Sequence, residues 1–389
     1  MKPDIGLSQH SGPATPASGG WQTSHWKPEH VELIDPEQAV CAPRIAAVQR
    51  LGGELDLWDY WPVQTPDGHA AQIVGGTLYM FLSAPRHPDI EARHSVARIR
   101  LMHHVGSDWR DLGPLFADDF SPGSREWSGS SILSSPHELT LYFTAAGRRG
   151  EASVTFEQRL FEVDVRLDVD GEAISLKDWS SPREMLVPDN HYYMNEMSGN
   201  GSVGTIKAFR DPAYFRDPAD GAEYVLFAAS LAKSNSPWNG AVGIAWRTPN
   251  GRWQGLPPLV EADRLNNELE RPHVITHGGR YYLFWSTQNK VFAPDGPAGP
   301  TGLYGMVADQ LLGPWQPING SGLVFANPPM APFQAYSWLV LPDLRVQSFA
   351  DLVGLAHPPQ NQAEARAHFA GSPAPELRLA LSGDRAWLA

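Results

Sequence analysis

Short runs of aromatic and β-branched residues, separated by turn-forming residues, recur along the whole chain and predict many short strands. One such run ends in Phe and occurs five times, with the poorest match last: Thr77–Phe81, Leu139–Phe143, Glu223–Phe227, Arg280–Phe284 and Arg345–Phe349. Successive Phe residues lie 62, 84, 57 and 65 positions apart, roughly the length of a four-stranded unit with its loops. The repeat predicts an all-β chain folded as a five-bladed β-propeller. A β-sandwich or a two-sheet solenoid with chance similarity also fits this periodicity.

A polar or acidic cluster ends some 13 to 22 residues before the Phe of each run. The five clusters are Trp58-Asp59, Glu126-Trp127-Ser128, Arg210-Asp211-Pro212, Glu268-Leu269-Glu270-Arg271 and Gln334-Ala335-Tyr336. If each run is the second strand of a blade, its cluster falls on or at the end of the first, innermost strand. The carboxylates of Asp59, Asp211 and Glu270 then converge in a central, funnel-shaped active site.

Helices are expected to be few. Pro36–Leu51, with Asp35 as N-cap, fits a short amphipathic helix, and Ala363–Phe369 fits another. Residues 1–25 are rich in Ser, Pro and Gly near the start and are expected to form a disordered tail. No linker divides the remainder, so residues 26–389 are expected to form one propeller domain.

Composition narrows the range of partners. The 36 Gly and 35 Pro residues are spread between the apolar runs, as many turns require, and the 14 Trp residues offer faces on which sugar rings can stack. A net charge of −13 disfavours nucleic acid, because it repels the phosphate backbone. No apolar stretch approaches the roughly 20 residues of a membrane span. The single cysteine, Cys41, excludes an internal disulfide, and no spacing of Cys and His predicts a zinc site.

Three acidic residues around an aromatic pocket suit retaining glycoside hydrolysis, which needs a nucleophilic carboxylate and a carboxylic acid that protonates the leaving oxygen. The local sequences are more specific. Five segments resemble, in order, the motifs of glycoside hydrolase family 68, which contains levansucrases, inulosucrases and bacterial β-fructofuranosidases: residues 57–64, 125–130, 209–212, 268–273 and 332–337. The resemblance extends from about Trp26 to Leu379.

This resemblance implies a five-bladed propeller that takes sucrose as fructosyl donor. Asp59 resembles the nucleophile, although a turn or capping Asp would look the same. Glu270 resembles the general acid/base, for which burial and neighbouring carboxylates should raise the pKa. Asp211 resembles the stabiliser of the transition state, which holds fructosyl hydroxyls. Arg271 is expected to bind substrate, or only to form an ion pair with Glu270.

The resemblance also implies the walls of the fructosyl subsite. Trp58 and Trp127 form its apolar faces, unless both belong simply to the core. Ser128 can donate a hydrogen bond to the free oxygen of the nucleophile, and Arg210 holds substrate. Glu126 either reaches the pocket or holds Arg125 or a strand end.

On the glucosyl side, Glu268 and Tyr336 match positions that contact glucose or support the acid/base. Where the family usually has Arg or His, this chain has Gln288, with Asn289 and Lys290 as alternatives if the alignment moves. A neutral amide lacks a charge-assisted contact there. The substitution predicts weaker binding of growing chains, and hence hydrolysis or short fructo-oligosaccharides in place of long fructan.

No cofactor is expected. Gram-positive members of the family use an Asp before the acid/base motif in a calcium site, whereas the matching residue here is Asn267, so we expect no structural metal. The chain is similar to the shorter Gram-negative members, which implies an extracellular or periplasmic protein. We also expect a monomer.

Three other motifs predict no chemistry. Gly199–Gly204 fits a dinucleotide-binding pattern without its βαβ context and is expected to be a loop. His103-His104 lacks a third metal ligand, and the second Arg-Asp-Pro, Arg216–Pro218, is expected to be a surface turn.

Two alternatives to the sucrose-cleaving transferase remain. An invertase of family 32 would carry Glu-Cys-Pro at the acid/base, but Cys41 lies far from Glu270 in the sequence. A noncatalytic sugar-binding propeller would have no need of an acid/base pair.

Overall fold

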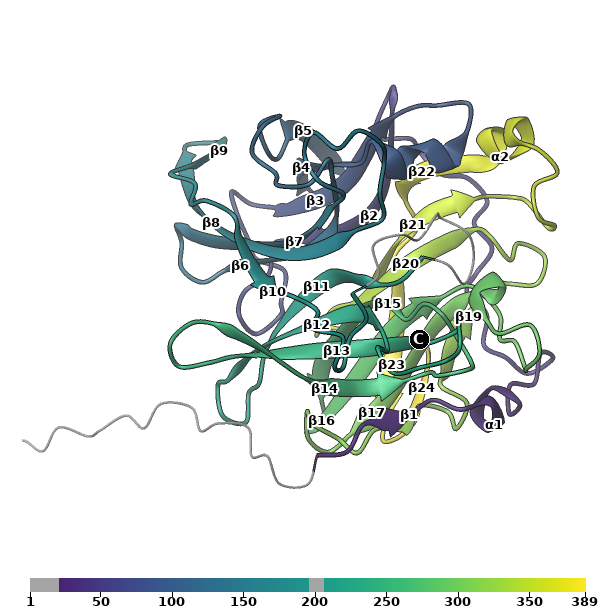
Figure 1. Ribbon diagram of the computed structural model, residues 1–389. Helices are drawn as coiled ribbons and strands as arrows, with labels where there is room; N and C mark the ends of the chain where they lie inside the picture. Colours follow the sequence, from purple (N-terminus) through teal and green to yellow (C-terminus); the bar gives the residue numbers. More distant parts are fainter. Residues whose placement is uncertain (1–20, 196–205) are drawn as a thin grey trace, which may run out of the picture.

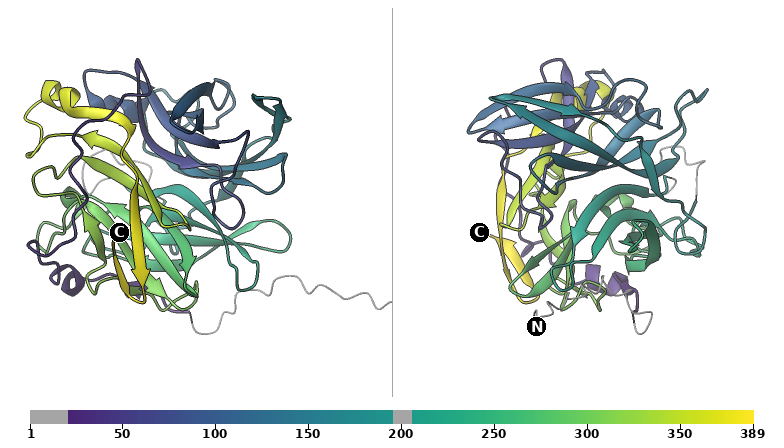
Figure 2. Two further views of the ribbon diagram at one scale, coloured as in Figure 1. Left: turned by 180° about the vertical axis from the view of Figure 1, so that it is seen from behind. Right: turned by 90° about the vertical axis from the view of Figure 1, so that its left-hand side faces the viewer.

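The computed structural model describes residues 21–195 and 206–389 and consists of five sheets arranged around a central channel (Figure 1). All the sheets are antiparallel except for one parallel N-terminal strand. Each blade uses a continuous stretch of chain, except that one N-terminal strand is added to the third blade. The innermost strand of the first blade contacts strands of the fifth blade (Figure 2). The first and last blades in the sequence are thus neighbours, which closes the ring. The predicted five-bladed propeller is confirmed.

The strands of the five blades, from the channel outward, and the short helices have the following bounds. Blade 1 contains β2 (Leu55–Pro62), β3 (Thr77–Pro85), β4 (Arg98–Val105) and β5 (Asp108–Pro114), with the 3₁₀ helix η1 (Ile90–Ser95) between β3 and β4. Blade 2 contains β6 (Arg125–Leu133), β7 (Glu138–Ala146), β8 (Gln158–Asp170), β9 (Ala173–Lys177) and β10 (Arg183–Leu186). Blade 3 contains β11 (Phe209–Arg216), β12 (Glu223–Ser230), β13 (Gly240–Arg247), β14 (Trp253–Glu261) and the N-terminal β1 (Ser24–His25). Blade 4 contains β15 (Glu270–His277), β16 (Arg280–Thr287), β17 (Gly302–Ala308), β18 (Gln316–Pro317) and β19 (Leu323–Ala326), with η2 (Asn289–Val291) after β16. Blade 5 contains β20 (Ala335–Val340), β21 (Arg345–Leu352), β22 (Phe369–Pro373), β23 (Leu377–Ser382) and β24 (Arg385–Leu388), and the α-helices are α1 (Pro28–Val31) and α2 (Gln362–His368).

The repeated runs are the second strands of the blades, as the sequence predicts. They lie in β3, β7, β12, β16 and β21, and each polar cluster lies on, or directly before, the inner strand of the same blade. The match has a simple cause: second strands are covered on both faces by neighbouring blades, so all eight residues of β12 except the first are buried.

Every inner strand carries a β-bulge at its polar cluster. The pairing register shifts after Trp58 in β2, after Trp127 in β6, and at the corresponding points of β11, β15 and β20. In β2 the extra residue places Leu57 and Tyr60 in one apolar cluster and Trp58 and Trp61 in another, although strict alternation would separate each pair. The bulge leaves the residue between them, Asp59, unpaired in the ladder.

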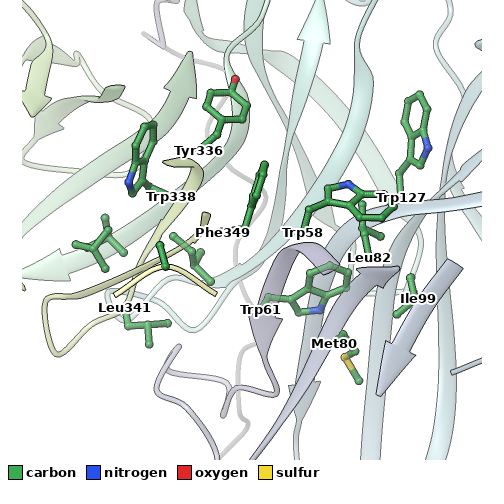
Figure 3. Close-up of a cluster of buried hydrophobic side chains, with 14 of the residues drawn as sticks. Trp58, Trp61, Met80, Leu82, Ile99, Trp127, Tyr336, Trp338, Leu341 and Phe349 are labelled. Carbon is green, nitrogen blue, oxygen red and sulfur yellow. The ribbon is translucent and has the colours of Figure 1, made fainter. Parts of the chain in front are cut away.

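The largest apolar cluster lies where blades 1, 2, 4 and 5 meet. Figure 3 shows ten labelled members, among them Trp58, Trp61, Trp127 and Phe349, with the hydroxyl of Tyr336 pointing away from the apolar side chains. Trp58 and Trp61 are at most 2% exposed. Burial of each such side chain contributes on the order of 2 to 3 kcal/mol to folding.

The N-terminal segment differs from the prediction. Ser24 and His25, placed in the tail, form β1 beside β14, and residues 1–20 lie outside the described residues. Trp26 inserts into an aromatic cluster 5.3 Å from the ring of Trp285 and is 1% exposed. The predicted helix at 36–51 is wrong, because this stretch instead runs as turns and extended chain along blade 4, where Cys41 bridges to Ala326.

The C-terminal helix prediction is confirmed, since α2 spans Gln362–His368 with Asn361 as its N-cap. Among the described residues, no helix has the length and apolar character needed to cross a membrane.

Candidate active site

Asp59 sits at the bulge of β2, where it faces blade 2. The hydroxyl of Ser128, itself at the bulge of β6, donates a 2.7 Å hydrogen bond to Oδ2 of Asp59. This is the contact that the sequence analysis anticipated. It fixes one carboxylate oxygen and leaves the other available for reaction.

Glu270 begins β15 and is held by two partners from other blades. Arg210 donates to Oε1 at 2.6 Å, and the hydroxyl of Tyr336 donates a short hydrogen bond to Oε2. The same guanidinium nitrogen of Arg210 lies 3.8 Å from Oε1 of Glu268. Four predicted site residues, from blades 3, 4 and 5, thus meet in one contact group.

The charges of this group differ from the sequence prediction. Burial alone would raise the pKa of Glu270, but the guanidinium of Arg210 and the hydrogen bond from Tyr336 outweigh it and hold the pKa below its ordinary value. Burial and the nearby Glu270 charge raise the pKa of Glu268 to about 7. The predicted rise at Glu270 is therefore wrong for the free protein, and of the two carboxyl groups Glu268 is the one with the raised pKa.

Asp211 lies at the bulge of β11 with a φ of 61°, a left-handed conformation that costs a non-glycine residue on the order of 1 kcal/mol. Its backbone N–H donates to Oγ1 of Thr144, and its Oδ2 accepts from the backbone N–H of Arg271 at 3.3 Å. Burial, with Glu270 and Asp59 nearby, raises its pKa to about 7 against the opposing charge of Arg210. The carboxylates of the three blades therefore share one electrostatic environment.

Arg271 does not form the ion pair with Glu270 that was the alternative expectation for it. Its guanidinium donates to the carbonyl and hydroxyl of Ser337 and to the carbonyl of Tyr60, and the residue is 5% exposed. The salt bridge of Glu270 is with Arg210 and not with Arg271. Arg271 thus ties blades 1, 4 and 5 together, and it also lines the cavity beside Asp211, so its contact with substrate stays a prediction.

The two predicted Trp walls have different partners. The indole N–H of Trp127 donates to the carbonyl of His94 at 3.2 Å, and the ring of His94 meets Trp58 edge-on with 5.9 Å between centroids. The guanidinium of Arg93 lies 5.6 Å from the Trp58 ring centre. Both indoles are buried in the central core, so each belongs to the core and also borders the site.

Three side chains singled out from the sequence have hydrogen-bond partners other than the catalytic carboxylates. Glu126 accepts from Arg98 at 2.8 Å and from the backbone of Ile99, so it holds a strand end, and burial raises its pKa to about 7. Asp217, predicted on a surface turn, does lie in a turn but is 7% exposed and accepts from the hydroxyl of Tyr281. His103 is buried, with Nε2 2.9 Å from a backbone carbonyl.

The three residues that are alternatives around position 288 have different surroundings after β16. Gln288 precedes η2, and no hydrogen bond caps the helix from its side chain. Asn289 faces away, donating to the carbonyl of Gly299. Lys290 is the residue whose charge acts on Glu268, and the carbonyl of Val291 accepts from the backbone N–H of Asn267.

Sequence reasoning missed the residues that support this site from strands without a motif. Gln158 accepts from the backbone of Phe209 and lies 3.4 Å from the Arg210 guanidinium. Burial and the adjacent Arg93 lower the pKa of His94 to about 4, and burial raises that of Asp351, near Asp59, to about 7. Gln158 lies on the third strand of blade 2, His94 in η1 and Asp351 on the second strand of blade 5. A sequence pattern of inner-strand clusters cannot point to these places.

Within 21–195 and 206–389, no group of three or more His, Cys, Asp or Glu side chains could hold a metal ion. The Gly199–Gly204 motif falls outside the described residues. A cavity of about 790 Å³ is lined by Asp211 and Arg271 together with residues such as Gln64, Tyr214 and Thr276.

The fold and the three converging carboxylates define a five-bladed propeller with the residue set of a retaining glycoside hydrolase. The family model described as Levansucrase/Invertase matches residues 22–243 and 233–389, and the chain belongs to that family, glycoside hydrolase family 68.

Individual relatives agree with this assignment. Levansucrase LscA of Pseudomonas savastanoi pv. glycinea is 32% identical, over 85% of both chains, and the levansucrase of Rahnella aquatilis is 31% identical, over 87% of both. The structure of an inulosucrase from Halalkalicoccus jeotgali bound to kestose superposes with a TM-score of 0.86 at 37% identity, over 94% of this chain and 95% of the other.

Proposed function

We propose that the protein is a retaining fructosyltransferase that cleaves sucrose, releases glucose and passes fructose to water, sucrose or a growing fructan. The observation that carries the proposal is the meeting of Asp59, Asp211 and Glu270 from three blades, with Ser128 and Arg210 already bonded to two of them. The levansucrase and inulosucrase relatives support the choice of sucrose as donor.

In the first step, the free oxygen of Asp59 attacks the anomeric carbon of the fructosyl unit, and the bond to the glucosyl oxygen breaks. Glu270 gives that oxygen a proton, and glucose leaves. Asp211 accepts hydrogen bonds from fructosyl hydroxyls while positive charge develops on the ring. The products of this step are glucose and a fructosyl ester of Asp59.

In the second step, Glu270 takes a proton from the hydroxyl of water or a sugar acceptor, whose oxygen attacks the same carbon and frees Asp59. Because both steps invert the carbon, the configuration is retained overall. Tyr336 orients the Glu270 carboxyl through its hydrogen bond in both directions of proton transfer.

Arg210 and Glu268 control the protonation state of Glu270. In the free protein Arg210 stabilises the Glu270 anion, and the neighbouring Glu268 has a pKa of about 7, so it takes up a proton below neutral pH. When sugar hydroxyls engage Arg210, the stabilisation of the anion weakens and the proton can move to Glu270. Substrate binding thus creates the acid that the reaction needs.

The acceptor side favours short fructo-oligosaccharides or hydrolysis. Gln288 offers a neutral amide beside the glucosyl pocket, and the nearest cation that acts on Glu268 from η2 is the flexible, exposed Lys290. A growing chain therefore gains less from charge-assisted contacts than it would from a fixed Arg.

The protein acts outside the cytoplasm, in the periplasm or the medium, as a monomer.

Incubation of the purified protein with sucrose tests the proposal when glucose, fructose and oligosaccharides are followed together. Glucose in excess of fructose is expected, with products mainly of low molecular weight. Equal amounts would indicate a hydrolase, high-molecular-weight polymer would contradict the Gln288 argument, and sugar binding without glucose release would identify a noncatalytic propeller.

A further inference from the structure

The ammonium group of Lys207 contacts three oxygen atoms between blades 3 and 4. Its ammonium donates to the carbonyl of Pro237 at 2.5 Å, to Oδ1 of Asn239 at 2.9 Å and to Oδ1 of Asn267 at 3.2 Å. These oxygens belong to two separate segments, the loop between β12 and β13 and the connection from β14 to β15, while Lys207 itself leads into β11. One cation therefore joins three pieces of chain.

Hydrogen bonds other than those of the lysine also orient the two asparagine oxygens. The amide nitrogen of Asn239 donates to the carbonyl of Leu231, and that of Asn267 donates to the carbonyl of Ile206, so each Oδ1 is turned toward the ammonium. Both asparagines are fully buried. Three converging oxygen dipoles without a cation would repel one another and lack partners, which is costly for buried groups.

Both ends of Lys207 connect to the catalytic group. Its carbonyl accepts from Nε2 of Gln158 at 2.7 Å, and the Oε1 of Gln158 lies 3.4 Å from the guanidinium of Arg210. Its ammonium holds Asn267, whose backbone continues into Glu268 and whose amide is 3.5 Å from the Glu268 carboxylate. Arg210 and Glu268 are the two residues that determine where the acid proton resides.

We infer that Lys207 is a positioning residue whose ammonium fills a cation site of the protein, fixing Arg210 and Glu268 relative to Glu270. The inference rests on the proposed function, because its effect on catalysis is defined through the acid/base pair. Loss of the charge releases the Asn267 segment directly, because the ammonium holds Oδ1 of Asn267. The contact with Gln158 is made by the backbone carbonyl of Lys207 and weakens only because that piece of chain loses its side-chain anchor. The expected result is slower protonation of the leaving group with little change in sucrose binding.

The first test compares Lys207→Met with Lys207→Arg, and uses Lys177→Met, an exposed lysine on β9, as the matched control. For Lys207→Met we expect kcat for glucose release, measured well below the unfolding temperature, to fall about tenfold while KM changes less than about twofold. Lys207→Arg should recover part of kcat, and Lys177→Met should behave like the parent. A Lys207→Met protein with parental kcat would overturn the inference.

The second test asks whether the site needs a cation or only the length of a lysine. Lys207→Asp places a carboxylate beside the oxygens of Pro237, Asn239 and Asn267, a donor set that Ca²⁺ prefers. We expect millimolar CaCl₂ to raise both kcat and the unfolding temperature of Lys207→Asp, but neither property of the parent or of Lys207→Met.

The two readouts separate the possible failures. If Lys207→Met does not fold, the calcium response of Lys207→Asp still decides the matter, and the absence of that response would overturn the cation site. If the parent releases no glucose from sucrose, the proposed function fails, whereas a calcium-dependent unfolding temperature of Lys207→Asp would still support the site itself.

Discussion

The site has two regions that are built differently: the catalytic floor, formed by Asp59, Asp211 and Glu270, and the rim, formed by Gln288 and Lys290. Each floor carboxylate stands at a bulge or start of an inner strand and is fixed by a hydrogen bond from another blade. The rim residues lie around a three-residue 3₁₀ helix, and no hydrogen bond caps that helix from the side chain of Gln288.

This difference in structure assigns a different role to each region: the floor cleaves the bond, and the rim determines the products. Bond cleavage needs reacting atoms held to a fraction of an ångström, which strands joined across blades can provide. Acceptors of changing length need a surface that tolerates variation, and loops provide it. Substitutions in the floor should therefore abolish turnover, whereas substitutions in the rim should change the products.

The largest effect is expected at the nucleophile. Asp59→Asn preserves the shape of the side chain and can still accept the hydrogen bond from Ser128. It removes the negative charge of the oxygen that attacks the anomeric carbon. We expect kcat for glucose release to fall by about 10⁴-fold or more, with sucrose binding preserved.

Steady-state kinetics and calorimetric binding of sucrose check this prediction, with the exposed Asp118→Asn as control. Substantial turnover by Asp59→Asn would show that the floor does not work as assigned.

The second effect is on stability and depends on pH. Burial raises the pKa of Asp211 from 3.8 to about 7, which corresponds to about 4 kcal/mol at most. Between these values the folded protein holds a proton that the unfolded chain releases, so stability is full below pH 4 and is lost as the pH rises through 7. Asp211→Asn, which carries no charge, should match the parent at pH 4 and exceed its free energy of unfolding at pH 8, although it is inactive.

Urea unfolding at several pH values measures this crossover. Equal pH dependence of Asp211→Asn and the parent would contradict the raised pKa.

The floor was largely predictable from the sequence and the contacts beneath it were not. Polar clusters at a regular distance before five buried runs locate inner strands, and motif identity assigns Asp59 and Glu270. The direction of Arg271 and the pairing of Arg210 with Glu270 depend on left-handed residues at bulges, and φ is 48° at Arg271. A bulge changes the face of every later side chain in its strand, and no local pattern in the sequence announces it.

A smaller effect is expected at Ser128. Its hydrogen bond to Asp59 is charge-assisted, and such bonds contribute about 1.5 to 3 kcal/mol. Ser128→Ala should lower kcat by about 10- to 100-fold with little change in KM, and Ser128→Thr should restore part of it. The exposed Ser134→Ala serves as control. A loss expressed only in KM would indicate that Ser128 holds substrate and not the nucleophile.

The smallest effect on total turnover, and the largest on products, is expected at the rim. Gln288→Arg adds a fixed guanidinium beside the glucosyl pocket and should raise the ratio of transfer to hydrolysis a few-fold, because a bound acceptor gains a charge-assisted contact. Lys290→Gln removes the cation by which η2 acts on Glu268 and should lower the same ratio. Both ratios follow from glucose minus fructose, divided by glucose, in the sucrose assay. If the two variants change kcat by orders of magnitude while the ratio stays constant, the rim belongs functionally to the floor, and the separation between the two regions fails.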